Sequence, residues 1–269
     1  MNLSAVKLVV SDMDGTLLNS KGEVSPLFFE IFKKLQLQNI LFCAASGRQY
    51  NSIVDKLSAI KDDIYVIAEN GGIAKKGTEV LLLKALETKK VLKVIPVLRN
   101  IQDTNIVLCS QDIAYIESKD KEFIELFQEY YQSFKIVDDL LEVAEKTPIL
   151  KIAVYHFSSS EDFIYPKIKY LKEDYLLKIS GQNWLDISDE QANKGNALRA
   201  VQKLLNISKE ETMVFGDYHN DIEMLQEASF SFAMENAHTD IKAIAKYATK
   251  SNNNFGVERV LEKLVNSKK

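Results

Sequence analysis

Hydrophobic and polar positions follow a recurring pattern in the N-terminal part of this chain. Short apolar runs, such as residues 6–10 and 40–43, are typical of buried strands, while residues 26–37 carry apolar positions at helical spacing. The apolar stripe of that predicted helix consists of Leu27, Phe28, Ile31, Phe32 and Leu35. Strands and helices that alternate in this way predict a parallel sheet with covering helices over residues 1–84.

The middle of the chain has a different order of elements. Helix-like stretches lie at residues 86–98, 121–134 and 161–171, and strand-like stretches lie at residues 105–109, 113–116, 150–157 and 175–179. This order predicts an α+β domain with one open sheet. We interpret the apolar run at residues 184–187 as the return of the first pattern. The expected fold class is α/β: a Rossmann-like parallel-sheet core of residues 1–84 and 186–269, with an inserted α+β domain of residues 85–185.

Composition narrows the classes of protein that the chain can belong to. Its 269 residues, 46% of them hydrophobic, support more than one buried core. A net charge of -4 and scattered lysines provide no general attraction to nucleic acid. Cys43 and Cys109 lie in apolar runs and are interpreted as buried free thiols in a reducing compartment. No apolar run has the length of a membrane span and no signal peptide precedes the first strand, so we expect a cytoplasmic protein without nucleic-acid or membrane partners.

Two carboxylates at residues 12–16 (DMDGT) are the first candidates for chemistry. Asp12 and Asp14 come at the end of the first predicted strand, which is where open α/β sheets bind their ligands. Carboxylates this close repel each other, so the pair either holds a divalent metal or keeps one proton. Oxygen ligands favour magnesium over zinc. An ordinary turn rich in Asp and Gly is the alternative interpretation.

Three later segments place further polar residues at strand ends or helix starts. Ser46 and Gly47 follow a strand, so the hydroxyl can bind a phosphate oxygen or cap a helix. Lys194 opens a predicted helix, where the dipole disfavours a cation unless an anion also binds there. Asp217 follows another strand and can reach the same cation as Asp12. Asp221, one helical turn further on, can act through water or by orienting Lys194.

Taken in order, these segments resemble the four motifs of the haloacid dehalogenase-like phosphatases. They read DMDGT at residues 12–16, AASGR at residues 44–48, NKGNAL at residues 193–198 and GDYHND at residues 216–221. The long gap before the third motif, and ENGG at residues 69–72, resemble the type IIB or Cof-like class, in which the inserted domain is a cap. The resemblance implies a Mg2+-dependent phosphatase that hydrolyses small phosphorylated metabolites: sugar phosphates, nucleotides or cofactor phosphates.

The resemblance also implies a role for each matching residue. Asp12 is the nucleophile that forms an aspartyl phosphate, and Asp14 is the general acid and base. The phosphate-binding residues are Ser46, Gly47, Lys194 and Asn220. The Mg2+ ligands are Asp12, Asp14 through its backbone carbonyl, Asp217 and Asp221. Contacts with substrate or cap are expected from Arg48, Asn70 and Asn193, for which capping and turn roles are the alternatives.

Other interpretations stay open at this point. A phosphomutase or phosphotransferase of the same superfamily would use the same residues with a different phosphoryl acceptor. A non-catalytic regulatory protein would be expected to lack part of the catalytic set, which is complete here. We interpret His219 as a loop residue, because no second His or Cys lies nearby in sequence to suggest a zinc site, and His156 and His238 as structural. The sequence leaves the physiological substrate and the oligomeric state open.

Overall fold

The computed structural model describes residues 3–267, which form two compact units. Within these residues, the first unit contains the segment up to Ser46, the segment Ile53–Leu82 and everything from Asn193 onward. The second unit contains Gly47–Ser52 and Leu83–Ala192. The chain therefore contributes to the second unit twice, once briefly after Ser46 and once through its long middle segment.

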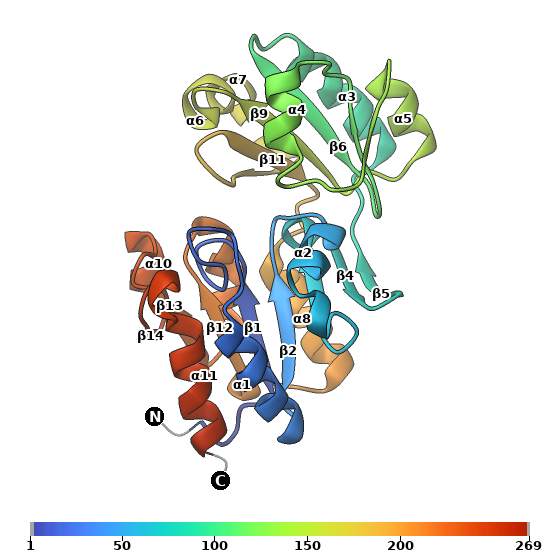
Figure 1. The fold of residues 1–269 in the computed structure, drawn as a ribbon. Coiled ribbons are helices and arrows are strands. Elements are labelled where there is room, and N and C mark those ends of the chain that lie inside the picture. Colours follow the sequence, from blue (N-terminus) through green and yellow to red (C-terminus); the bar gives the residue numbers. More distant parts are fainter. Residues whose placement is uncertain (1–2, 268–269) are drawn as a thin grey trace. The chain divides into compact units, whose positions relative to one another are not determined.

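The first unit is built on an eight-stranded sheet in the order β14-β13-β12-β1-β2-β3-β4-β5 (Figure 1). The strands are β1 (Leu8–Asp12), β2 (Leu41–Ala45), β3 (Tyr65–Ala68), β4 (Ile73–Lys76), β5 (Glu79–Leu83), β12 (Thr212–Gly216), β13 (Phe230–Ala233) and β14 (Tyr247–Ala248). From β14 to β3 all neighbouring strands are parallel, and β4 is antiparallel to β3. Strand β1 is central and buried along its whole length, which explains its continuous apolar run. The α/β class with a parallel-sheet core is confirmed.

Helices cover this sheet. They are α1 (Pro26–Leu37), α2 (Tyr50–Lys56), α8 (Lys194–Leu205), α9 (Ile222–Gln226), α10 (Thr239–Ile244) and α11 (Gly256–Ser267). The first residues of α2 belong to the second unit. Short 3-10 turns are η1 (Ser58–Ile60), η2 (Glu69–Gly71), η4 (Lys209–Glu211), η5 (His219–Asp221) and η6 (Asn252–Asn254). Figure 1 shows α1 and α11 side by side in front of the sheet, with α8 behind it. Helix α1 has the predicted bounds, because Ser25 caps its first turn and Pro26 occupies its first position.

The second unit contains a six-stranded sheet in the order β10-β11-β9-β6-β7-β8. Its strands are β6 (Thr104–Cys109), β7 (Ala114–Ile116), β8 (Phe134–Ile136), β9 (Lys151–His156), β10 (Leu176–Ile179) and β11 (Trp184–Ser188); its helices are α3 (Thr88–Arg99), α4 (Lys121–Phe127), α5 (Leu140–Lys146), α6 (Ser160–Phe163), α7 (Tyr165–Ile168) and the 3-10 turn η3 (Lys169–Glu173). Pairing is antiparallel except between β7 and β8.

Both faces of the second sheet are buried. On β6, Leu108 belongs to a core that includes residues of α3 and α5, whereas Val107 belongs to a core with Phe123 and Phe127 of α4. Neighbouring residues of a strand point to opposite faces, so two cores require apolar residues at successive positions. The aromatic ring of Trp184 packs against the second of these cores.

Strand β11 corrects one sequence interpretation. Residues 184–187 were expected to return to the first sheet, but Leu185 pairs with Val154 of β9 and Ile179 of β10 in the second sheet. The first unit resumes only at Asn193. An apolar run marks a strand without identifying its partners, which are distant in sequence. The predicted helix over residues 121–134 is also too long, since α4 ends at Phe127 and β8 follows it.

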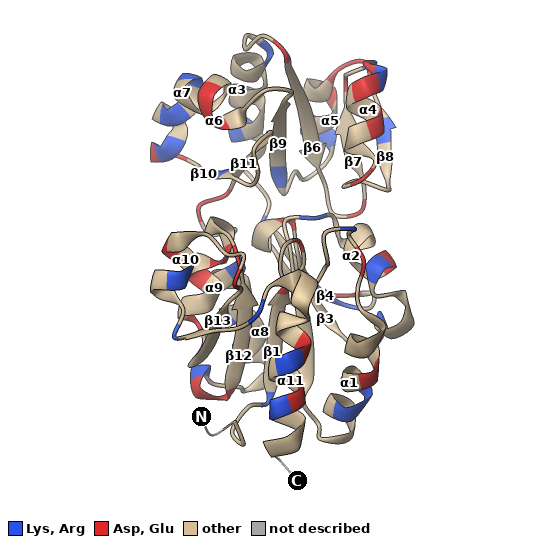
Figure 2. Ribbon diagram, turned by 60° about the vertical axis from the view of Figure 1, so that its left-hand side comes forward, with Lys and Arg blue, Asp and Glu red and all other residues tan. Residues whose placement is uncertain are grey.

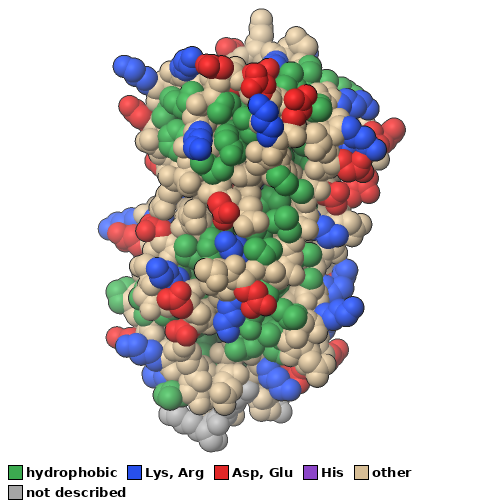
Figure 3. Space-filling model, turned by 90° about the vertical axis from the view of Figure 1, so that its right-hand side faces the viewer, with side chains coloured by type: hydrophobic (Ala, Val, Ile, Leu, Met, Phe, Trp, Pro, Cys, Tyr) green, Lys and Arg blue, Asp and Glu red, His purple; other side chains and the backbone are tan. Residues whose placement is uncertain are grey.

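Charged side chains are distributed over both units. Figure 2 shows acidic and basic residues together on helices such as α1 and α11, and on the face in Figure 3 positive and negative side chains are interspersed. Within residues 3–267, none of the helices combines the length and the apolar character needed to cross a bilayer. Cys43 and Cys109 are both buried thiols outside any disulfide, as predicted.

We predict that Gly71→Ala strongly destabilises the first unit. Gly71 has φ +97°, and an added Cβ would lie 2.3 Å from the carbonyl oxygen of Asn193. Backbone strain of about 1–2 kcal/mol and a forced displacement of about 1–3 kcal/mol should add to each other. Gly77→Ala is the matched control, since its φ is +56° and no atom lies within 4 Å of the new Cβ. If urea denaturation shows equal decreases in the free energy of unfolding for the two variants, the close approach of Gly71 to Asn193 does not contribute to the destabilisation.

Candidate active site

The carboxyl end of β1 sets the position of Asp12. In the sheet register Asp12 pairs with Ala45 of β2, and Ser11 pairs with Phe215 of β12. The residues that follow each of these parallel strands therefore emerge at the same edge of the sheet. Asp12 itself is buried, with 4% of its surface exposed.

A tight turn follows Asp12. The N–H of Leu17 donates to the Asp12 carbonyl at 3.3 Å, and Gly15 adopts φ +76°. Gly15 is required for a second reason, because an added Cβ would lie 2.3 Å from Oδ2 of Asp217. The side chain of Asp14 is exposed. The turn thus separates the two carboxylates, with Asp12 inside and Asp14 at the surface.

Lys194 joins residues from three motifs. Its Nζ lies 2.6 Å from Oδ1 of Asp12 and 2.7 Å from Oδ1 of Asp221, and the lysine is fully buried. Helix α8 begins at this lysine, and Asn193 caps the helix by accepting the N–H of Asn196 at 2.8 Å. The observed role of Asn193 is thus the capping alternative, and its contact with substrate stays a prediction.

Asp221 fixes the loop that carries Asp217. Its Oδ2 accepts the backbone N–H groups of Asp217 at 2.9 Å and Tyr218 at 3.2 Å, while its Oδ1 accepts from Lys194. Thr16 donates its hydroxyl to Oδ1 of Asp217 at 3.2 Å. Carboxylate oxygens of Asp12, Asp217 and Asp221 consequently lie within 4.8 Å of one another.

The charges in this cluster do not balance. Three carboxylates and the ammonium of Lys194 carry a formal charge of -2 when all are ionised, from -3 and +1. Burial raises the pKa of the Asp12 carboxyl well above its ordinary range, although Lys194 opposes the shift. Burial and the charge of Asp221 raise the pKa of Asp217 to about 7. Burial lowers the pKa of Lys194, but the carboxylates outweigh this effect and raise it overall, so the lysine stays charged.

A divalent cation fits this arrangement. The cluster offers only oxygen donors, which suit Mg2+ better than Zn2+. A charge of +2 would also offset the formal excess of the three carboxylates. The side chain of Asp14 is outside this group of three, so its predicted part in metal binding concerns its backbone carbonyl alone.

Two further candidates contact each other beside β2 and β3. The amide of Asn220 donates to Oδ1 of Asn70 at 3.0 Å. Asn70 has φ +53°, a conformation that Asn tolerates better than most residues, and its N–H donates to the carbonyl of Ser46 at 3.0 Å. The buried Ser46 in turn donates its own N–H to the carbonyl of Ile67. Ser46, Asn70 and Asn220 therefore form one connected group.

Gly47 and Arg48 each contact residues of the second unit. The Gly47 carbonyl accepts from Nζ of the buried Lys151 at 2.9 Å. Arg48 donates to the carbonyl of Glu129 at 2.9 Å, and its guanidinium lies 5.1 Å from the ring centroid of Tyr130. The binding of phosphate or substrate by these two candidates stays a prediction.

Sequence reasoning assigned no role to two residues of this region. Thr16 was visible in the first motif, and its bond to Asp217 gives it a positioning role. Asn236 donates to the carbonyl of Gly15 at 2.8 Å, and nothing in the sequence signalled it, because the two residues are far apart along the chain.

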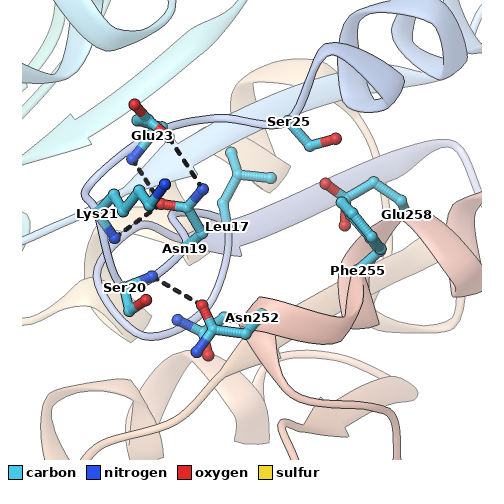
Figure 4. A pocket seen from close by; sticks show the side chains of 10 residues that line it. Leu17, Asn19, Ser20, Lys21, Glu23, Ser25, Asn252, Phe255 and Glu258 are labelled. Carbon is cyan, nitrogen blue, oxygen red and sulfur yellow. Dashed lines mark hydrogen bonds between the residues drawn. The ribbon is translucent and has the colours of Figure 1, made fainter.

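A polar hollow lies beside the segment that follows the first motif (Figure 4). Asn19 accepts the N–H groups of Lys21 at 2.9 Å and Glu23 at 3.1 Å, and the N–H of Ser20 donates to Asn253 at 2.9 Å. These bonds close the loop on itself and anchor it to η6. None of the residues that line the hollow belongs to the carboxylate cluster, so we interpret it as a structural feature of the loop.

A family model of haloacid dehalogenase-like hydrolases matches residues 9–261 of the chain. The chain therefore belongs to the haloacid dehalogenase-like hydrolases, and the predicted assignment to this superfamily, as an enzyme of its phosphatase type, is confirmed.

Individual relatives extend over nearly the whole chain. The 5-amino-6-(5-phospho-D-ribitylamino)uracil phosphatase YbjI of Escherichia coli is 32% identical, and the match covers 97% of both chains. The crystal structure of SMU.1108c from Streptococcus mutans has a TM-score of 0.87 at 26% identity, covering 97% of this chain and 99% of that one. BT4131, described as a subclass IIB sugar phosphatase, has a TM-score of 0.82 at 20% identity over 96% and 98% of the two chains, which shows a common fold.

Replacing Asp217 by Asn tests the electrostatics of the cluster. The pKa of this carboxyl is about 7 in the folded protein and has the ordinary value of about 3.9 in the unfolded chain. Between these values the folded state binds a proton that the unfolded state has lost, so the free energy of unfolding falls as the pH rises. The amide of Asn does not titrate, so this fall in the free energy of unfolding is absent from the variant. In EDTA we therefore expect Asp217→Asn to be more stable than the wild type above about pH 7, with a difference that shrinks toward about pH 4.

Urea unfolding followed by circular dichroism across this pH range measures the difference. Asp62→Asn is the control, because Asp62 is an exposed carboxylate of the same unit that lies outside the cluster. If the free energy of unfolding of wild type and Asp217→Asn depends on pH in the same way, folding does not raise the pKa of Asp217.

Proposed function

We propose that the chain is a Mg2+-dependent phosphatase of small phosphorylated metabolites, which works through an aspartyl-phosphate intermediate on Asp12. The observation that carries this proposal is the buried ammonium of Lys194 between Asp12 and Asp221, with Asp217 in the same carboxylate cluster. A buried, uncompensated negative charge at the carboxyl edge of a parallel sheet suits a site that binds a cation together with a phosphate.

The proposed first step uses the two carboxylates of the first motif. Lys194 holds Oδ1 of Asp12, which leaves Oδ2 to attack phosphorus in line. The new Asp12–phosphorus bond forms as the bond from phosphorus to the leaving oxygen breaks, and Asp14 donates a proton to that oxygen. The exposed position of Asp14 supports this role, since a leaving alcohol approaches from outside.

The second step reverses the proton transfer. Asp14, now ionised, takes a proton from water, whose oxygen attacks phosphorus. The Asp12–phosphorus bond breaks, and inorganic phosphate and the free carboxylate are restored. Throughout, the ammonium of Lys194 offsets charge on Asp12 and on the phosphoryl oxygens.

Magnesium belongs to the proposal as a cofactor. Asp12, Asp217 and the backbone carbonyl of Asp14 would hold it. Asp221 was predicted as a further ligand, but both of its oxygens accept hydrogen bonds, from Lys194 and from the N–H groups of Asp217 and Tyr218, so it would orient these groups instead. When bound, Mg2+ supplies positive charge that polarises the phosphoryl group.

The remaining candidates are assigned to binding. The hydroxyl of Ser46, the N–H groups around Gly47 and the amide of Asn220 would donate to phosphate oxygens. Arg48 and Asn70 would contact the substrate or the cap, and Asn193 would do so in addition to capping α8. The inserted residues, Leu83–Ala192 of the second unit, would act as the cap that chooses the leaving group.

The first test is phosphate release from a panel of sugar phosphates, nucleotides and cofactor phosphates. The panel includes 5-amino-6-(5-phospho-D-ribitylamino)uracil, because the E. coli relative is named for it. We expect activity with Mg2+, none in EDTA, and a fall of about 10⁴-fold or more in kcat for Asp12→Asn. Asp62→Asn, a change to an exposed carboxylate of the same unit, should retain wild-type activity.

Two outcomes would contradict the proposal. Phosphoryl transfer to an added sugar without phosphate release would identify a mutase or phosphotransferase. A folded wild type that is silent on the whole panel would favour a regulatory binding role, and activity that survives in Asp12→Asn would refute the assigned nucleophile.

A further inference from the structure

Two of the three histidines of the chain meet on the first unit, outside the carboxylate cluster. Nε2 of His219 lies 3.0 Å from Oδ2 of Asp240, and Nδ1 of His238 lies 3.5 Å from the same oxygen. The centroids of the two imidazole rings are 4.3 Å apart. Within residues 3–267, this trio and the cluster around Asp12 are the two groups whose ligand atoms all lie within 4.8 Å of one another.

The geometry points to a second cation site, and we propose that His219, His238 and Asp240 bind Zn2+. Zinc bonds to imidazole nitrogen and carboxylate oxygen are about 2.0–2.2 Å long, so ligand atoms at tetrahedral angles are about 3.3–3.6 Å apart. The two measured separations, 3.0 Å and 3.5 Å, lie close to this range. Water would complete the coordination, since all three side chains are solvent-accessible, with 38%, 40% and 61% exposed.

The donor set distinguishes this site from the one around Asp12. Imidazole nitrogen suits zinc and other late transition metals, whereas the carboxylate cluster offers only oxygen and suits Mg2+. Two chemically different cations can therefore be bound without competing for the same ligands. The sequence argued against zinc at His219 because no other His is near it along the chain, but the start of α10 brings His238 beside it.

Binding requires two local changes. Nδ1 of His238 accepts the backbone N–H of Asp240 at 3.2 Å as the cap of α10, and a cation at Nδ1 would replace that bond. The hydrogen bond between Nε2 of His219 and Oδ2 of Asp240 would likewise be replaced by bonds from both atoms to the cation. The loop is otherwise anchored, since the N–H of His238 donates to the carbonyl of Asp217 at 2.9 Å. The ring of Tyr218 packs edge-on against His219, with centroids 4.9 Å apart. These contacts hold both imidazoles near the arrangement that the metal needs.

Isothermal titration of the tag-free full chain with ZnCl2 tests the proposal, in a buffer with saturating Mg2+ to occupy the acidic cluster. We expect one saturable Zn2+ per chain. His219→Asn and His238→Asn should each weaken binding by about tenfold or more, because even partners of metal ligands contribute that much. Asn at position 238 can still cap α10. His156→Asn, which changes the histidine of the second unit, is the matched control and should bind Zn2+ like the wild type.

Co2+ in place of Zn2+ provides a second readout. Intense visible absorption of tetrahedral Co2+ is expected for the wild type and should be lost in both variants. Unfolding temperatures without zinc identify a variant that does not fold, in which case Asp240→Asn replaces it. The proposal is overturned if the wild type does not bind Zn2+, or if the histidine variants bind it like the wild type while Asp217→Asn does not, since zinc would then occupy the carboxylate cluster.

Discussion

The ion pairs of the buried Lys194 hold the rest of the candidate site in place. This ammonium is the one cation in contact with Asp12 and Asp221 among the described ion pairs, and neither carboxylate has significant contact with solvent. Removing it would leave buried carboxylates without an ion-pair partner, and such a change is strongly destabilising. Because Asp221 also accepts two backbone N–H groups of its own loop, the lysine is linked through it to Asp217. One side chain thus couples β1, α8 and the loop after β12.

The register of the parallel sheet supplies the second constraint. Pairing of Ser11 with Phe215 puts Asp12 beside the end of β12, and pairing of Asp12 with Ala45 puts Ser46 one residue beyond the same level. A slip of one residue would turn each of these side chains to the other face of the sheet. The burial of β1, β2 and β12 on both faces makes such a slip unfavourable, so packing far from the site determines its geometry.

Residues of the short turn η5 contact two different clusters of side chains. His219 and Asp221 are two residues apart on a 3-10 turn and therefore point in different directions. Asp221 faces Lys194 and the interior, while His219 faces Asp240 of α10. A segment of six residues in this way contributes carboxylate oxygens to the buried cluster and an imidazole nitrogen to the surface trio.

The sequence by itself determined the α/β class, the bounds of α1 and the positions of the four motifs at strand ends and a helix start, and the resemblance of these motifs indicated the family. Those features depend on local signals: apolar spacing, a Ser-Pro helix start, and polar residues directly after apolar runs. Only the tertiary structure decided that β11 joins the second sheet, that Thr16 and Asn236 support the site, and that His238 meets His219. These are contacts between residues far apart along the chain. They depend on strand pairing and helix packing, which leave no local pattern in the residues themselves.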